Sequence, residues 1–163
     1  MGYLQQGVWH TGWYDTTKTA GEFVREQTSF REWITADGSS RFAAEPDRYH
    51  LYVSLACPWA HRTLIFRALK KLDSVISVSV VEPVMGDDGW AFGDGDTSDA
   101  VNHASYLRDI YLAANPNFSG RVTVPVLWDK RTHTIVNNES AEIIRMLNSE
   151  FNAYTDVRTD YYP

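Results

Sequence analysis

The only cysteine in the 163-residue chain is Cys57, and Pro58 follows it directly. Proline is favoured at the first position of a helix, and apolar residues recur with helical spacing from Ala60 to Leu72. Cys57 is therefore predicted to lie at a helix N-terminus, where backbone N–H groups and the helix dipole favour a thiolate. Free cysteine is also among the most buried residue types, so an inert core thiol is the alternative. The position at a helix start favours the reactive thiol.

Two other segments carry side chains suited to binding. Residues 82–99 are rich in acids and glycine, contain no lysine or arginine, and include Trp90. This composition is typical of a surface loop. Glu139 and Ser140 open a predicted helix after two asparagines that suit capping positions. Taken alone, the second pattern indicates helix capping.

The elements that position these residues follow from hydrophobic periodicity and from the prolines and glycines between them. A strand, a helix and a second strand in this order indicate a parallel βαβ unit. A second helix, a hairpin and a last helix complete the order βαβαββα, which defines an α/β fold. Pro125 falls inside the third strand, a position that marks an edge, a strand start or a bend. The predicted ranges are strands 49–55, 75–81, 122–128 and 134–136, and helices 58–72, 101–114 and 139–149.

Length and composition limit the class of protein. The chain suits one domain of ordinary size, and 44% hydrophobic residues suffice for a core. A net charge of −6 disfavours nucleic acid as a partner, and no apolar run approaches the ~18 residues of a membrane span. With one cysteine and no export signal at the start, the predicted location is the cytoplasm.

The N-terminal segment differs from the rest of the chain. Residues 1–47 are rich in aromatic side chains and lack regular periodicity. Large aromatic side chains can hold an irregular segment on a surface because they bury much apolar area. We therefore predict an N-terminal arm over residues 1–47, anchored by its aromatic residues on a domain that spans 48–152.

Several longer segments of the chain are distinctive. They are YHLYVSLACPWAHR (49–62), the Gly89-Trp90 pair, SGRVTVPVLW (119–128) and IVNNESAEIIRM (135–146), with Gly7-Val8-Trp9-His10 and Trp13-Tyr14-Asp15 near the start. Together they resemble the thioredoxin-like domain of the glutathione transferases, and more closely the Xi class, the glutathionyl-hydroquinone reductases. The resemblance covers nearly the whole chain. It implies a thioredoxin-like fold with an extended N-terminal arm.

The resemblance also implies a site for glutathione, the co-substrate, and no metal. Cys57 would be the catalytic nucleophile, and the backbone of Val124, before a cis Pro125, would pair with the cysteinyl part of glutathione. Glu139 suits the ammonium group of the γ-glutamyl part, and Ser140 suits its carboxylate. The other glutathione contacts that the resemblance implies are Trp90, Arg121, Val122 and Thr123. A solvated surface charge is the alternative for Arg121.

The implied function is reduction of glutathionyl-hydroquinones through a mixed disulfide between Cys57 and glutathione. Position 60 is alanine, so the chain has no Cys-x-x-Cys pair and needs an external thiol to release the bound glutathione. The expected partners are glutathione and glutathionylated aromatic substrates, with a homodimer as a further option. The alternative function is a non-catalytic module that binds glutathione or a protein.

Enzymes of this family are about twice as long as this chain, as expected of two domains. The resemblance therefore implies that their helical C-terminal domain is absent from this chain and that residues 153–163 begin the linker to it. The outer sides of the helices at 58–72 and 139–149, including Phe66 and Met146, are then expected to be exposed.

Overall fold

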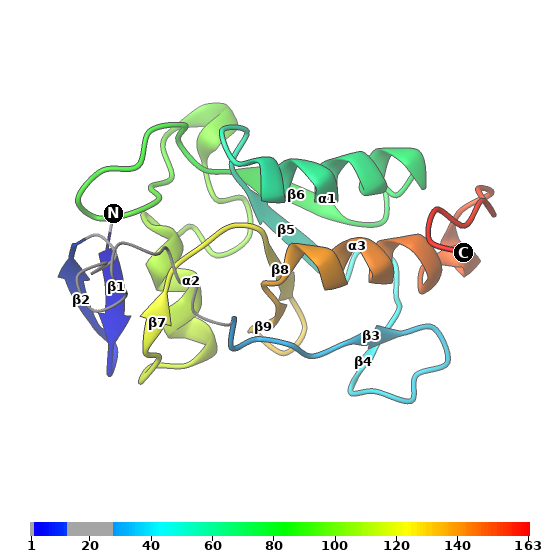
Figure 1. Ribbon diagram of the computed structural model, residues 1–163, viewed down its shortest axis with the longest axis horizontal. Helices are drawn as coiled ribbons and strands as arrows, with labels where there is room; N and C mark the ends of the chain where they lie inside the picture. Colours follow the sequence, from blue (N-terminus) through cyan, green and yellow to red (C-terminus); the bar gives the residue numbers. More distant parts are fainter. Residues whose placement is uncertain (1, 13–27) are drawn as a thin grey trace, which may run out of the picture.

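A four-stranded mixed sheet forms the centre of the computed structural model, which describes residues 2–12 and 28–163 (Figure 1). Its strands are β5 (Tyr49–Val53), β6 (Ser77–Val80), β8 (Val126–Asp129) and β9 (Thr134–Asn137), in the order β6-β5-β8-β9. β5 runs parallel to β6 and antiparallel to β8, and β9 pairs antiparallel with β8. All five residues of β5 are buried, as expected of a strand covered on both faces. The predicted thioredoxin-like fold is confirmed.

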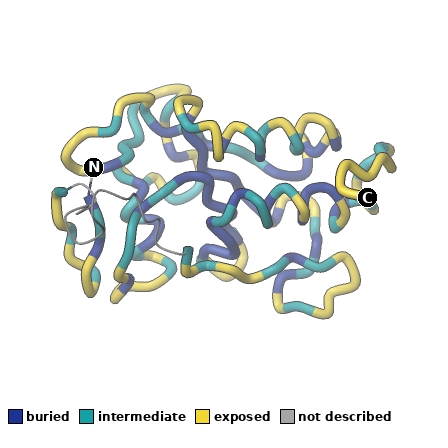
Figure 2. The backbone as a smooth tube through the Cα atoms, in the orientation of Figure 1, coloured by how far each residue is buried: buried dark blue, intermediate teal, exposed yellow. Residues whose placement is uncertain are grey.

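Helices cover both faces of this sheet. α1 (Pro58–Leu69) and α3 (Ser140–Ser149) lie side by side on one face, and α2 (Leu107–Ala114) lies on the other (Figure 1). Short 3-10 turns occur at Gly95–Thr97 (η2) and Asn152–Tyr154 (η3). Figure 2 shows the buried residues concentrated in the sheet and on the helix sides that face it. None of the helices described is long and apolar enough to cross a membrane.

Two predicted starts differ most from the structure, for different physical reasons. The helix expected over 101–114 begins only at Leu107. The buried carboxylate of Asp99 accepts hydrogen bonds from the backbone N–H groups of Val101, Asn102 and Ala104, which fixes this segment as a loop. The strand expected over 122–128 begins at Val126. Proline has no N–H to donate to the ladder, so regular pairing starts after Pro125.

The N-terminal segment contributes strands of its own. β1 (Gly2–Gln5) pairs with β2 (Val8–Thr11) and with β7 (Gly120–Arg121), and β3 (Ile34–Thr35) pairs with β4 (Phe42–Ala43). Ile34 and Phe42 are fully buried in the core, and Phe30 stacks on Phe118. Among the aromatic residues predicted to anchor the arm, Trp13, Tyr14 and Phe23 lie outside the described residues.

A buried ion pair joins Arg48, the residue before β5, to Asp129, the last residue of β8. Asp129 is fully buried and accepts two hydrogen bonds of 2.9 Å from the guanidinium of Arg48. The hydroxyl of Thr132 and the backbone N–H of Arg131 donate to the same carboxylate. Burial disfavours the carboxylate, but these hydrogen bonds outweigh it and lower the pKa of Asp129. Paired in this way, the buried charge is compatible with the core.

The exposed apolar surface of the two adjacent helices differs from the expected one. Met146 is fully buried, because it lies on the inner side of α3 and its sulfur accepts the backbone N–H of Ile34. Phe66 packs edge-on against Tyr161 near the end of the chain. Large exposed apolar side chains do occur on α1, at Trp59, Ile65 and Leu69.

Candidate active site

The turn between β5 and α1 places Cys57 at the N-cap of α1, with Pro58 at the start of the helix. Two hydrogen bonds shape this turn, from Cys57 N to the Ser54 carbonyl oxygen and from Ala56 N to the Ser54 hydroxyl, both 3.2 Å. The Cys57 side chain is partly exposed. It is therefore not the fully buried thiol of the alternative interpretation, and it lies where the helix dipole favours a negative charge.

The segment before β8 lies opposite the thiol. Cys57 Sγ is 3.9 Å from the carbonyl oxygen of Val124. The peptide bond between Val124 and Pro125 is cis, as predicted. The side chains of Val122 and Val124 are buried in the core, so this segment presents its backbone to the thiol.

Tyr111 of α2 holds the same segment from behind. Its hydroxyl donates to the Thr123 carbonyl oxygen at 2.8 Å and accepts from the Thr123 backbone N–H at 3.2 Å. The side-chain amide of Asn138 donates to this hydroxyl at 3.0 Å. One buried phenol thus links α2, the segment before β8 and the segment that leads into α3.

The start of α3 brings Glu139 and Ser140 next to α1. Glu139 is the N-cap of α3 and accepts the backbone N–H of Ala141 at 3.3 Å. The asparagines before it do not cap the helix as predicted. Asn137 ends β9 and accepts the backbone N–H of Glu139 instead. The capping role expected of Glu139 is therefore present, and its carboxylate lies at the N-terminal end of α3.

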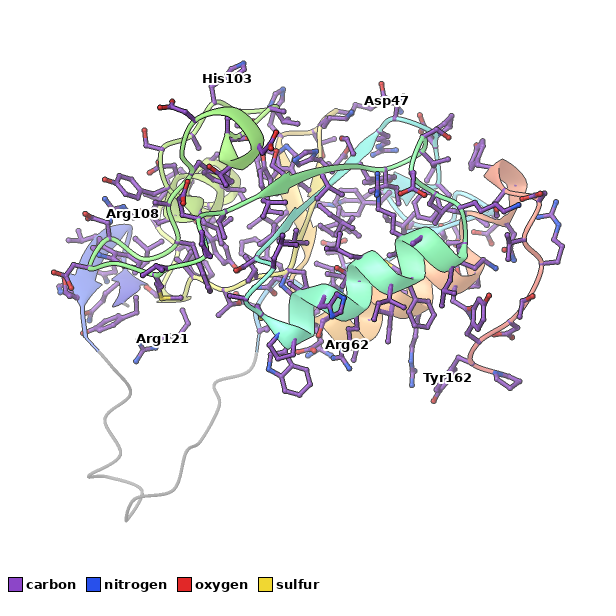
Figure 3. All side chains as sticks on the ribbon, turned by 90° about the horizontal axis from the view of Figure 1, so that it is seen from above. Asp47, Arg62, His103, Arg108, Arg121 and Tyr162 are labelled. Atoms are coloured by element: carbon purple, nitrogen blue, oxygen red, sulfur yellow. The ribbon has the colours of Figure 1, made fainter. Side chains whose placement is uncertain are left out.

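Arg62, the fifth residue of α1, completes this corner of the site. Its Nε and Nη2 atoms donate to the hydroxyl oxygen of Ser140 at 2.9 and 2.5 Å, and Nη2 lies 3.9 Å from the Glu139 carboxylate. The guanidinium also lies over the ring of Trp59, and Figure 3 shows Arg62 on α1 at the side where α3 lies. Arginine can only donate. The hydroxyl oxygen of Ser140 must accept here, which leaves its hydrogen to donate to a further group.

The sequence interpretation did not assign Arg62 a role. The residue was visible as the last position of the segment 49–62, but its partner Ser140 is 78 residues away along the chain. The available signal was topological. β5 and β9 are both antiparallel to β8, so α1 and α3, which follow them, begin at the same end of the sheet. A cation near the start of α1 therefore lies close to the start of α3.

Trp90 and Arg121 form a second group of predicted contacts. Trp90 is partly exposed, and its carbonyl oxygen accepts the backbone N–H of Leu107 at 2.9 Å. Arg121, in β7, donates to the carbonyl oxygens of Gly12 and Gly2 and lies over the ring of Tyr3. Arg121 is therefore held against the N-terminal hairpin, and it is not the solvated surface charge of the alternative interpretation.

The strand that leads to Cys57 carries polar groups that stay neutral near physiological pH. Burial lowers the pKa of His50 to about 4, and burial raises the pKa of Tyr52 well above its usual range. Tyr52 donates to the buried carboxylate of Asp99. Within residues 2–12 and 28–163, no group of three or more His, Cys, Asp or Glu side chains is arranged to hold a metal ion.

Comparisons with known proteins agree with this geometry. The family model described as "Glutathione S-transferase, N-terminal domain" matches residues 56–150. A glutathionyl-hydroquinone reductase of Escherichia coli is 58% identical to the chain, over all of this chain and 52% of the relative. The chain spans about half the length of the curated relatives it matches.

Solved structures give the same result. A Xi-class glutathione transferase from Natrialba magadii superposes with a TM-score of 0.87 at 48% identity, over all of this chain and 49% of the other. The glutathione-bound structure of a glutathione transferase homologue from Escherichia coli gives a TM-score of 0.84 at 53% identity, over 99% of this chain and 50% of the other. The chain therefore belongs to the Xi class of the glutathione S-transferase family and carries the N-terminal domain of that family.

Proposed function

We propose that this chain is the glutathione-binding part of a glutathione-dependent reductase that acts on glutathionyl-hydroquinones. The observation that carries the proposal is the position of Cys57, a partly exposed thiol at the N-cap of α1 that lies 3.9 Å from the Val124 carbonyl oxygen. The relatives from Escherichia coli and Sphingobium chlorophenolicum are named glutathionyl-hydroquinone reductases, which supports this substrate class.

The proposed reaction has two steps. The Cys57 thiolate attacks the sulfur of the glutathionyl group, an S–S bond forms, and the bond between that sulfur and the aromatic carbon breaks. The electron pair of the broken bond stays on the carbon, which takes a proton and leaves as hydroquinone. A second glutathione thiolate then attacks the mixed disulfide, which yields oxidised glutathione and regenerates the Cys57 thiolate. An external thiol is needed because Cys57 is the only cysteine in the chain.

Glutathione would bind across two segments near Cys57, the one before β8 and the start of α3. The backbone of Val124 suits strand-like pairing with the cysteinyl part, which brings the glutathione sulfur towards Cys57. The γ-glutamyl part would lie at the start of α3, with its ammonium group on Glu139. The hydroxyl hydrogen of Ser140 is left to donate to the γ-glutamyl carboxylate, because Arg62 already donates to the oxygen of that hydroxyl. The positive charge of Arg62 favours the same carboxylate.

We expect the aromatic part of the substrate to contact the half of the relatives' length that this chain does not match. The chain spans about half the length of its relatives, and the glutathione-binding residues lie within it. We therefore expect the isolated chain to take up a glutathionyl group on Cys57 and to release hydroquinone slowly or not at all.

Intact-mass measurement after incubation with oxidised glutathione tests the nucleophile. We expect one glutathionyl adduct on the chain and none on the Cys57→Ser variant, because an alcohol is a poor nucleophile in disulfide exchange. A parent chain without an adduct would contradict the assignment of Cys57.

Hydroquinone release from a glutathionyl-hydroquinone tests the substrate class, with the relative from Escherichia coli as the positive control. Release by the chain at the rate of that control would show that the chain alone contains the whole substrate site. It would contradict the expectation that the aromatic part binds elsewhere.

A further inference from the structure

The N-terminal hairpin, β1 and β2, is fixed to the body of the domain at three places. β1 pairs with β7, with Tyr3 opposite Arg121 and Leu4 opposite Gly120, and Leu4 is buried in the core. At the hairpin turn, Gly7 has a φ of +79° and its backbone N–H donates to the Phe118 carbonyl oxygen at 3.0 Å. The hairpin therefore has a defined place in the fold.

One side of this hairpin supports the loop that carries Trp90. The indole Nε1 of Trp9 donates to the Asp87 carbonyl oxygen at 3.0 Å. The indole ring also fills the space beside Gly89, since a Cβ at Gly89 would lie 2.9 Å from ring carbon Cη2 of Trp9. Gly89 has a φ of +82°, which suits glycine. Trp9 thus contacts the loop backbone immediately before Trp90.

Arg108 of α2 clamps the same contact. Its guanidinium lies over the ring of Trp9, 5.1 Å from the centroid, and over the ring of Tyr106 at 4.3 Å. Its Nη1 atom donates to the carboxylate of Asp88 at 2.8 Å, so the arginine bridges the hairpin, the loop and α2. Cations over aromatic faces are attracted by the ring electrons. The loop is held on both sides of Asp88.

The other side of the hairpin holds Arg121. The Nη1 atom of Arg121 donates to the carbonyl oxygen of Gly12 at 3.0 Å and of Gly2 at 3.3 Å. The guanidinium also lies 5.3 Å from the ring centroid of Tyr3. Figure 3 shows Arg108 and Arg121 beside the hairpin, on its two sides.

We propose that the hairpin β1–β2 is a positioning element of the glutathione site, in which Trp9 sets the place of Trp90 and the hairpin backbone sets the place of Arg121. The inference rests on the proposed function, because Trp90 and Arg121 are glutathione contacts only under that proposal. Trp9 itself is a positioning residue, because it acts through the loop that carries Trp90. Binding costs less conformational entropy when the loop that carries Trp90 is already ordered than when glutathione must order it.

The first test observes Trp90 without any ligand. Chains labelled with 5-fluorotryptophan give one fluorine resonance per tryptophan, and a Trp90→Phe variant assigns that of Trp90. Trp9→Ala and Gly89→Ala should each shift or broaden the Trp90 resonance, while the resonance of Trp128, fully buried in β8, stays in place. Val8→Ala, at a neighbouring residue that is 58% exposed, is the matched control and should leave both resonances unchanged. An unchanged Trp90 resonance in both Trp9→Ala and Gly89→Ala would overturn the inference.

The second test measures glutathione binding by calorimetry. Trp9→Ala should raise the Kd about tenfold, and Trp9→Phe, which keeps a ring beside Gly89 but loses the hydrogen bond to Asp87, should raise it less. In a Trp90→Ala background, Trp9→Ala should have little further effect, because its action passes through Trp90. An equal effect in both backgrounds would show a general structural role and would overturn the inference. A parent chain that does not bind glutathione contradicts the proposed function, and the fluorine spectra still decide the role of Trp9.

Discussion

Glu139→Gln separates the capping role that the structure shows for Glu139 from the binding role that the proposed function gives it. The carboxylate caps α3 by accepting the backbone N–H of Ala141, and under the proposed function it also binds the ammonium group of glutathione. Glutamine has the same length and keeps an oxygen that can accept the capping hydrogen bond. The substitution therefore removes the charge and keeps the cap. Glu139→Ala removes both.

The size of the effect follows from the surroundings of this side chain. Glu139 is only 19% exposed, so solvent screens its charge incompletely. A hydrogen bond to a charged group contributes about 1.5–3 kcal/mol. Glutamine keeps such a bond to the ammonium group and loses the attraction between opposite charges, so only part of the contribution is lost. A loss of about 1–1.5 kcal/mol in binding free energy corresponds to a rise in Kd of about five- to tenfold. The free energy of unfolding should not change for Glu139→Gln and should fall by about 1 kcal/mol for Glu139→Ala.

Calorimetric titration with glutathione and urea unfolding measure the two quantities on the same samples. Glu142→Gln is the matched control, because this carboxylate lies on the same helix but pairs with Arg31. We expect its glutathione affinity to equal that of the parent. If Glu139→Gln also binds glutathione as tightly as the parent, Glu139 serves only as a helix cap and the proposed γ-glutamyl site is wrong.

Three further predictions follow from other contacts. Cys57→Ser should bind glutathione within about threefold of the parent yet form no mixed disulfide, as intact mass would show, because binding uses other residues. Arg62→Met should weaken glutathione binding about tenfold in calorimetry, because the hydroxyl of Ser140 loses its two donors. Asp129→Asn should lower the free energy of unfolding by about 3 kcal/mol in urea, because the buried guanidinium of Arg48 loses its buried carboxylate partner and keeps only the more exposed Glu45. The pKa of Asp129 is lowered from 3.8 in the folded chain, so its contribution is complete above that value and is lost as the pH falls through the folded pKa. The variant should lack this acid-dependent loss of stability.

Local patterns were sufficient for the central elements. β5, α1 and α3 are encoded by apolar periodicity and by Pro58, and each forms within the range that the pattern predicts. The start of α2 could not be predicted in this way, because residues 101–104 have a compatible pattern and their backbone is taken by the carboxylate of Asp99. That carboxylate is itself fixed by Tyr52 from a different strand. Hydrophobic periodicity could not predict this outcome, because the position of Asp99 depends on a hydrogen bond from a residue 47 positions earlier in the chain.

The residues of the candidate site also differ in whether the local sequence could predict their role. The chemistry-bearing residues Cys57, Glu139 and Ser140 each begin a helix, and a helix start has a local signature that the sequence displays. Arg62 lies inside a helix, and its role depends on the packing of α1 against α3. Nothing in the residues around Arg62 distinguishes it from a solvated helix cation. Only its contact with Ser140 does so.

The N-terminal segment packs on the domain although it lies outside the matched family region. Residues 56–150 match the family model, yet Leu4, Ile34 and Phe42 outside this region are almost or completely buried in the same core. Trp9 likewise fills the space beside Gly89, which only a residue without a Cβ leaves open. The tryptophan at position 9 therefore packs in this way only when position 89 is glycine, although the two residues are 80 positions apart in the sequence. We therefore expect a chain without the N-terminal hairpin to hold the loop that carries Trp90 less firmly, because the contacts of Trp9 with Asp87 and Gly89 would be lost.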